Sequence, residues 1–132
     1  MFLFGKKKTE PEREQKKKET ASVPNREELL KKAEELIQKL EGVQDKKEKT
    51  ALLNEIGSCF FQAEEQDQAI HYYEMSLSED RQLGKAYTDL LKLYNQKRQA
   101  AAEAKDDAKL TEYMEKVQNL MQMSKDVIRG KI

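Results

Sequence analysis

The sequence predicts an all-α protein, and three observations carry that prediction. Apolar residues recur every three or four positions in five segments between residues 26 and 129, as on one face of a helix. No segment alternates apolar and polar residues as a half-buried strand does. The connections between these segments are short. We therefore expect about five helices, arranged as antiparallel hairpins in one domain, residues 25–132.

Residues 1–24 differ from the rest in composition, because almost no large apolar side chain follows Phe4. A segment that cannot bury apolar surface cannot offset the entropy of ordering its chain. This stretch holds seven Lys or Arg against four Glu, which leaves eighteen against twenty-one in residues 25–132. We expect a disordered, basic tail at residues 1–24.

The first expected helix, residues 26–41, has a start signal and a stop signal. Asn25 and Glu28 have the spacing of a capping box, in which each side chain bonds the backbone N–H of the other residue. Gly42 is a stop signal at the other end. One face carries Leu29, Ala33, Leu36, Ile37 and Leu40. A charged connector at residues 43–50 is expected to follow.

The second and third helices are expected on either side of a short break at residues 65–67. The second helix carries Leu52, Leu53, Ile56, Cys59, Phe60 and Ala63 at helical spacing. The third carries Ala69, Ile70, Tyr73 and Leu77 on one side.

The fourth helix is expected to begin near Gln82 and the fifth to be long. The fourth carries Leu83, Ala86, Tyr87, Leu90, Leu91 and Tyr94. A turn is expected at residues 105–107, because paired aspartates favour a turn or an N-cap over a helix interior. The stripe of the fifth helix is Leu110, Tyr113, Met114, Val117, Leu120, Met121, Val127 and Ile128, and Gly130 ends it. We expect Met114 and Met121 to fill the core.

Part of this pattern returns after 34 residues. Leu53, Ile56, Gly57 and Phe60 correspond to Tyr87, Leu90, Leu91 and Tyr94. Together with Ala69 and Tyr73, the first set makes residues 50–83 resemble the tetratricopeptide repeat (TPR) family of stacked helical hairpins. Small residues at positions 57 and 69 would let two helices approach, while Phe60 and Tyr73 fill the space between them.

Residues 84–129 are expected to form a degenerate, lengthened second repeat. Leu91 replaces the small glycine, and Lys109 and Tyr113 take the positions of Ala69 and Tyr73 about six residues late. Since a single repeat cannot bury its own apolar face, we expect the helix at residues 26–41 to cap the first repeat.

The resemblance implies a non-enzymatic adaptor that binds a peptide or helix in the groove lined by the first helix of each hairpin. The groove positions would be Asn54, Ser58, Phe61, Gln62, Lys85, Thr88, Lys92, Asn95 and Gln96. Amides can pair with an extended backbone, and Lys85 and Lys92, seven residues apart on one face, could receive a carboxylate. Asp89 departs from the pattern of carboxylate-clamping members, where an arginine would help.

Composition disfavours other classes of function. Cys59 and His71 are the only residues of their types, and no glycine-rich phosphate loop occurs, so we expect no enzyme, metal or cofactor. Nucleic-acid binding is disfavoured because residues 25–132 are net acidic. No stretch approaches the roughly 20 apolar residues that span a bilayer. A single cysteine fits a reducing compartment, so we expect the cytoplasm.

Two alternatives stay open. Phe2, Leu3 and Phe4 could enter the headgroup region at the inner face of a membrane, while Lys6, Lys7 and Lys8 meet anionic lipid weakly. The order of apolar and basic residues is the reverse of that in a secretion signal. Alternatively, the long last helix could pair with itself or with a partner through three heptads of apolar residues, which would give a homo-oligomer.

Overall fold

A computed structural model describes residues 25–130, which form five α-helices and no strand. The helices are α2 (Arg26–Leu40), α3 (Lys46–Gln62), α4 (Gln66–Glu79), α5 (Lys85–Glu103) and α6 (Asp107–Ile128). The predicted all-α class is confirmed. The expected disorder of residues 1–24, and the proposed membrane contact of Phe2 to Lys8, lie outside the described residues.

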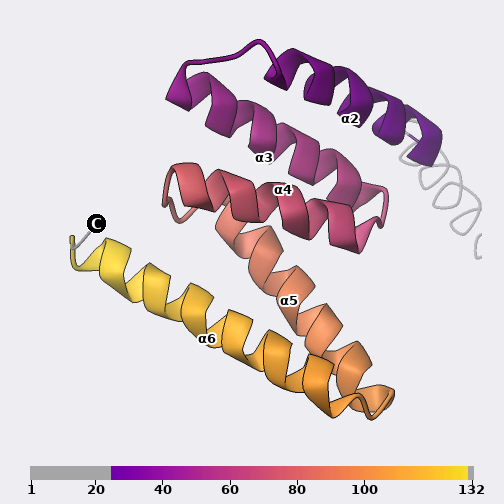
Figure 1. Cartoon of the computed structure of the whole chain (residues 1–132), viewed down its shortest axis with the longest axis vertical. Coiled ribbons are helices and arrows are strands. Elements are labelled where there is room, and N and C mark those ends of the chain that lie inside the picture. The colour runs from indigo at the N-terminus through magenta and orange to yellow at the C-terminus, as the bar shows by residue number, and fades with distance from the viewer. Residues whose placement is uncertain (1–24, 131–132) are drawn as a thin grey trace, which may run out of the picture.

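The helices lie side by side in chain order, and the chain reverses direction at each turn (Figure 1). Each helix packs against the next along the chain, and α3 also contacts α5. The helix expected to cap the array, α2, lies on α3 at one edge, and α6 lies at the other edge (Figure 1).

Two apolar clusters hold this array together. The smaller joins α2 to α3 through Ala33, Leu36, Ile56 and Cys59. The larger joins α4, α5 and α6 through Ala69, Ile70, Tyr73, Leu77, Ala86, Leu90, Leu93, Tyr94 and Leu120. Repeat positions Leu53, Ile56, Ala69, Tyr73, Leu90 and Tyr94 are buried, while Phe60 and Tyr87 are half-buried.

Gly57 lies at a close contact between α3 and α4. A Cβ atom at this position would lie 2.7 Å from Cδ1 of Tyr73, which is closer than real Cβ atoms come to a neighbour. The glycine therefore lets the Tyr73 ring lie directly on the backbone of α3. Phe60 stacks instead on Tyr72, with ring centroids 5.7 Å apart.

Side-chain caps set the starts of three helices. The predicted capping box is present, with the Glu28 N–H donating to Asn25 Oδ1 at 2.8 Å and the Asn25 N–H donating to Glu28 Oε1 at 3.2 Å. Asp45 caps α3 and Asp106 caps α6, each accepting a bond from the N–H three residues on, at 3.0 Å and 3.1 Å. The paired aspartates thus start α6, as the sequence predicts.

The turns of the α3/α4 and α5/α6 hairpins have the same backbone conformation. Glu64 in the α3/α4 turn and Lys105 in the α5/α6 turn both have positive φ, 65° and 58°. In each turn the following residue donates its N–H five positions back, Glu65 to Phe60 at 2.8 Å and Asp106 to Ala101 at 2.9 Å. This is the Schellman pattern, which satisfies carbonyls at a helix end.

The α5/α6 hairpin is longer than the α3/α4 hairpin. Shifted by 34 residues, the last residue of α3, Gln62, corresponds to Gln96, yet α5 runs on to Glu103. These additional residues are about two helical turns.

Three expectations about helix limits and helix faces were wrong. Residues 46–50 belong to α3 and not to a connector, because Asp45 starts the helix. The fourth helix begins at Lys85, so Leu83 precedes it and is exposed. Met114 and Met121 are exposed and not in the core, because α6 is rotated so that Tyr113, Val117 and Met123 pack against the larger cluster.

Candidate functional site

The predicted groove positions lie on two helices that contact each other. Asn54, Ser58, Phe61 and Gln62 lie on α3, whereas Lys85, Thr88, Lys92, Asn95 and Gln96 lie on α5. The ammonium group of Lys85 lies 6.0 Å from the centroid of the Phe61 ring, so side chains of the two helices meet. We call the surface formed by these positions the α3/α5 face.

A cavity of about 470 Å³ opens on this face. It is lined by Phe61, Glu64, Gln66, Leu93 and Gln96. Phe61 is half-buried and Leu93 is buried, so the floor is apolar, while Gln66 donates to Gln96 at 2.7 Å on the rim. An apolar surface bordered by two amides and the side chain of Glu64 suits an apolar side chain flanked by peptide groups.

Two of the predicted positions supply positive charge. Lys85 is exposed, but its ammonium group lies 2.9 Å from the carboxylate of Asp89. Lys92 is also exposed, and no ion pair among the described residues involves it. Lys92 is therefore the cation that can meet a ligand carboxylate without first giving up a partner.

Asp89, the position that departs from the carboxylate-clamping pattern, is buried beneath this face. It accepts a hydrogen bond from the Tyr73 hydroxyl at 2.7 Å as well as the contact from Lys85. Burial, reinforced by the bond to Asp89, raises the pKa of Tyr73 well above its ordinary value. Asp89 thus serves the packing of α4 on α5 and neutralises Lys85.

Four other predicted positions, Asn54, Ser58, Gln62 and Asn95, are engaged within the fold. The Ser76 hydroxyl donates to Asn54, which directs Asn54 toward α4. Asn95 donates to the Leu91 carbonyl of its own helix at 3.1 Å, and Gln62 donates to Ser58 at 3.0 Å. Of the predicted positions, Phe61 and Gln96 line the cavity, and Asn54 does not. The Lys85 ammonium lies near the Phe61 ring, and Lys92 lies one helical turn before Gln96 on α5.

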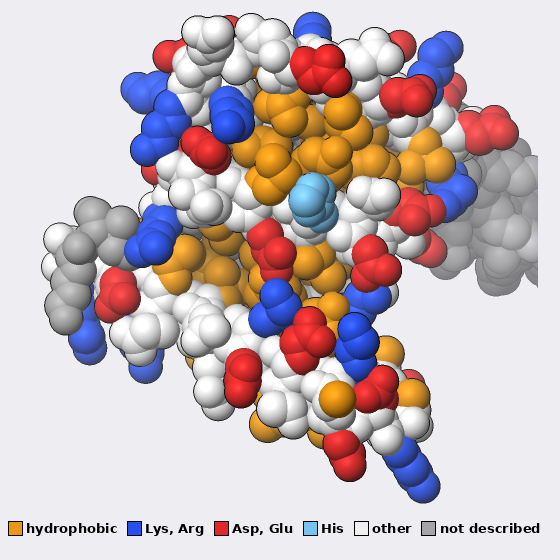
Figure 2. All heavy atoms as spheres, in the orientation of Figure 1, with side chains coloured by type: hydrophobic (Ala, Val, Ile, Leu, Met, Phe, Trp, Pro, Cys, Tyr) orange, Lys and Arg blue, Asp and Glu red, His pale blue; other side chains and the backbone are white. Residues whose placement is uncertain are grey.

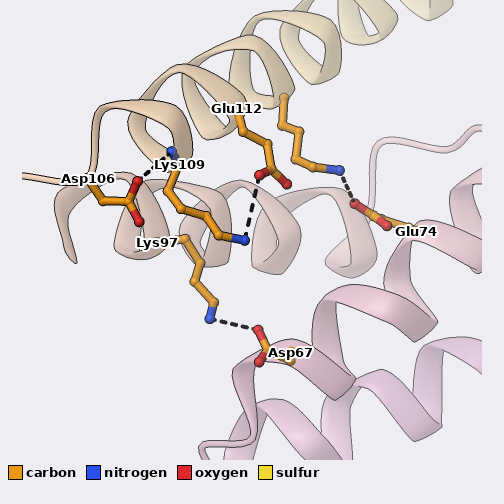
Figure 3. Close-up of polar contacts among 7 residues, drawn as sticks. Asp67, Glu74, Lys97, Asp106, Lys109 and Glu112 are labelled. Atoms are coloured by element: carbon orange, nitrogen blue, oxygen red, sulfur yellow. Dashed lines mark hydrogen bonds and ion pairs between the residues drawn. The ribbon is translucent and has the colours of Figure 1, made fainter. Parts of the chain in front are cut away.

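A second cleft, also about 470 Å³, lies between α4 and α6 with α5 at its floor. Glu74 of α4 accepts from the Tyr94 hydroxyl and pairs with Lys116 of α6 at 3.1 Å. Figure 3 shows Glu74 meeting a lysine from α6, and Lys97 of α5 reaching Asp67 at the start of α4, 2.7 Å away. These contacts hold the long hairpin to α4, and this cleft was not predicted from the sequence.

An apolar patch lies between α2 and α4, beside the only histidine of the chain (Figure 2). Half-buried Leu30, Ile37, Phe60 and Tyr72 contribute to it. His71 is exposed and its ring meets the Tyr72 ring edge-on at 4.9 Å. Ile37 was expected on the core face of α2, and Leu30 was not predicted to belong to any surface.

The described part of the chain contains neither a cluster of metal-binding side chains nor an activated cysteine. No group of three or more His, Cys, Asp or Glu within residues 25–130 could hold a metal ion. Cys59 is buried, and burial raises the pKa of its thiol, which keeps it protonated and unreactive. None of the described helices has the length and apolar character needed to cross a bilayer.

No protein-family model, curated protein or solved structure matches this chain.

Proposed function

We propose that this protein is a non-enzymatic interaction module that binds a peptide or helix of another protein on the α3/α5 face. The observation that carries the proposal is the cavity lined by Phe61, Leu93 and Gln96. The Lys85 ammonium lies 6.0 Å from the centroid of the Phe61 ring, and Lys92 lies one helical turn before Gln96 on α5. Phe61 on α3 and Leu93 and Gln96 on α5 come from the first helices of two successive hairpins, the helices along which a TPR-like array binds its partners. Glu64 in the turn and Gln66 at the start of α4 complete the lining.

The repeated hairpin supports the TPR-like reading. The two turns share positive φ at their central residue and the same pair of closing hydrogen bonds, which is what two copies of one unit would have. The pairing of helices repeats as well, since α2 meets α3 as α4 meets α5. In this reading α2 is the remaining second helix of a preceding unit and covers the exposed side of the first repeat.

The face defines the chemistry of its ligand. An apolar side chain enters the cavity against Phe61 and Leu93, and the amides of Gln66 and Gln96 pair with the backbone beside it. Lys92 then meets an acidic side chain or a terminal carboxylate. The favoured ligand is a segment with an apolar anchor near an acidic residue.

A displayed library of random peptides tests this proposal with a defined probe. We expect selected peptides to share an apolar residue near Asp, Glu or the C-terminus, and to bind with micromolar affinity, about 8 kcal/mol. Phe61→Ser should weaken binding at least tenfold, and Lys92→Glu should do so without disturbing packing, because Lys92 is exposed.

The matched control is Ile37→Ser, which removes a half-buried apolar side chain from the patch between α2 and α4. It should leave the affinity within twofold, provided thermal unfolding shows that all variants are folded. Peptides that bind equally to wild type and Lys92→Glu, but lose affinity with Ile37→Ser, would place the site on the patch and refute the proposal.

We place this module in a reducing compartment, the cytoplasm. The support is chemical: Cys59 is the only cysteine of the sequence and lies buried, so the fold gains nothing from an oxidising environment.

A further inference from the structure

The outer surface of α6 carries an apolar stripe. Four large apolar side chains are exposed among the described residues, and three of them, Met114, Met121 and Ile128, lie on α6 seven residues apart. Their exposed fractions are 45%, 48% and 73%. Half-buried Leu110 and Val117 lie between them at spacings of four and three, and Val117, at the inner border of the stripe, also packs against the larger cluster.

This helix is packed far less completely than its neighbours. Over 22 residues α6 buries only Leu120, whereas α3 buries five residues over 17 and α5 six over 19. Its contacts are with α5, plus the Lys116 to Glu74 ion pair with α4. Figure 1 shows α6 at the edge of the array, with no described helix beyond it.

The spacing of the stripe fits a helix. Leu110, Met114, Val117, Met121 and Ile128 occupy the two apolar positions of a heptad, with Ser124 as the single polar member. Side chains at these positions insert between those of a facing helix. An extended strand, with its two-residue period, would not match a seven-residue repeat.

The charges at the two ends of α6 define the direction of such a partner. By helical spacing, the acidic Asp106 and Asp107 fall beside the stripe at its start, and the basic Lys125 and Arg129 fall beside it at its end. The remaining charges there, Lys105, Lys109 and Asp126, fall on other faces of the helix. A helix running the opposite way with an acidic start and a basic end would match both ends, and α6 itself has that character. Antiparallel pairing also aligns the helix dipoles favourably.

We propose that the stripe on α6 pairs with the same stripe of a second copy, antiparallel, about a two-fold axis near Val117 and Gln118. Met114 then packs against Met121 of the other copy, and Asp106 approaches its Arg129. A helix of this length is about 33 Å long, and two such helices bury on the order of 1,000 Å², at the low end of stable interfaces. The dimer is therefore weak and dissociates in the micromolar range.

The dimer has a consequence that rests on the proposed function. The stripe lies on α6, so pairing leaves the α3/α5 face of both copies open. Each dimer then offers two binding faces, and a partner with two cognate segments is held more tightly than one with a single segment. Self-association itself is measured without any ligand, so it stands or fails separately from peptide binding.

Sedimentation equilibrium of the full chain from about 1 μM to about 1 mM tests the pairing, since this range brackets a weak interface. We expect a reversible monomer–dimer equilibrium that weakens at least tenfold in Met114→Glu/Met121→Glu. The matched control is Leu83→Glu, which removes a side chain of similar exposure, 41%, before α5 and should change the dissociation constant less than twofold. A monomer at every concentration, or equal weakening by the control, overturns the proposal.

Disulfide trapping tests the direction of pairing in a Cys59→Ser background. Residue 118 lies near the proposed axis, so the cysteines of two Gln118→Cys protomers should come together and form a cross-linked dimer. Residue 125 lies far from the axis, so the cysteines of two Lys125→Cys protomers should stay apart and form no cross-link. Ready cross-linking through Lys125→Cys would show a parallel or different contact and overturn the antiparallel arrangement. Both positions are exposed, so neither substitution disturbs the core.

Discussion

At the scale of single residues, the contact between Gly57 and Tyr73 sets how closely α3 approaches α4. A methyl group at residue 57 would lie 2.7 Å from Cδ1 and 2.8 Å from Cε1 of a ring that is fully buried and cannot move aside. We expect Gly57→Ala to lower the free energy of unfolding by roughly 1–3 kcal/mol, the usual cost of overpacking. Urea unfolding measures this.

Gly42→Ala is the control for that substitution. A Cβ atom at residue 42 would meet nothing closer than a carbonyl oxygen at 4.0 Å, so we expect a change of at most about 0.5 kcal/mol. A Gly57→Ala variant as stable as Gly42→Ala would show that the helices are not in close contact.

Two buried tyrosines make stability depend on alkaline pH. Burial, reinforced by hydrogen bonds to Asp89 and Glu74, raises the pKa of Tyr73 and Tyr94 in the folded state. In the unfolded chain both titrate near pH 10, so their contribution to stability is complete below about pH 10 and falls as the pH rises further. The loss should be about 1 kcal/mol per pH unit for each tyrosine.

Unfolding free energies measured between pH 8 and 11 check this dependence. Tyr73→Phe/Tyr94→Phe should be less stable at neutral pH, because Asp89 and Glu74 lose donors, and should show a shallower decline above pH 10. Tyr87→Phe leaves both buried hydroxyls in place and should retain the wild-type slope. The interpretation would be wrong if the double variant declined as steeply as wild type.

At this scale the sequence predicts apolar residues better than polar ones. Periodicity predicts that Leu53, Ile56 and Tyr73 are buried, because each faces a neighbouring helix at the expected spacing. It does not predict that Asp89 is buried, because the cause is the Tyr73 hydroxyl, which arrives from another helix. The bond that directs Asn54 toward α4 was not predicted either, because its donor, Ser76, lies on another helix.

At the scale of helices, Asp106 is the cap that starts α6. Its carboxylate accepts from the Lys109 N–H, and we expect Asp106→Ala to cost about 1 kcal/mol, typical of a lost N-cap. The neighbouring Asp107→Ala keeps that bond and removes only a charge near the helix dipole, about 0.3–0.5 kcal/mol. Chemical unfolding monitored by circular dichroism compares the two, and equal losses would contradict the assignment of the cap.

Helix limits were predicted well where a cap has a complete signature. The capping box at Asn25 and Glu28 and the glycine stop at Gly130 mark the ends of α2 and α6 within a residue or two. The start of α3 was missed because Asp45 lies within a charged run that reads equally well as a loop. The side of α6 that packs against the core was predicted wrongly, because its eight apolar positions allow more than one rotation of the helix about its axis.

At the scale of the whole molecule, the array separates three surfaces. The α3/α5 face holds the cavity lined by Phe61, Leu93 and Gln96, and the cleft between α4 and α6 is bridged by the Glu74 to Lys116 pair. The stripe on α6 is exposed among the described residues. The TPR resemblance predicts that positions of α3 and α5 share one groove, but it does not predict which of them meet, as Phe61 and Lys85 do. It cannot predict Gln66 and Leu93 in the cavity, because those depend on the turn after α3 and on the rotation of α5.

The most direct test of the central claim is an amide chemical-shift titration of the assigned protein with a selected peptide. We expect the largest shifts in α3 and α5, at Phe61, Lys92, Leu93 and Gln96, and smaller ones elsewhere. Shifts confined to Leu30 and Ile37 on α2, or to the cleft between α4 and α6, would contradict the proposed binding face.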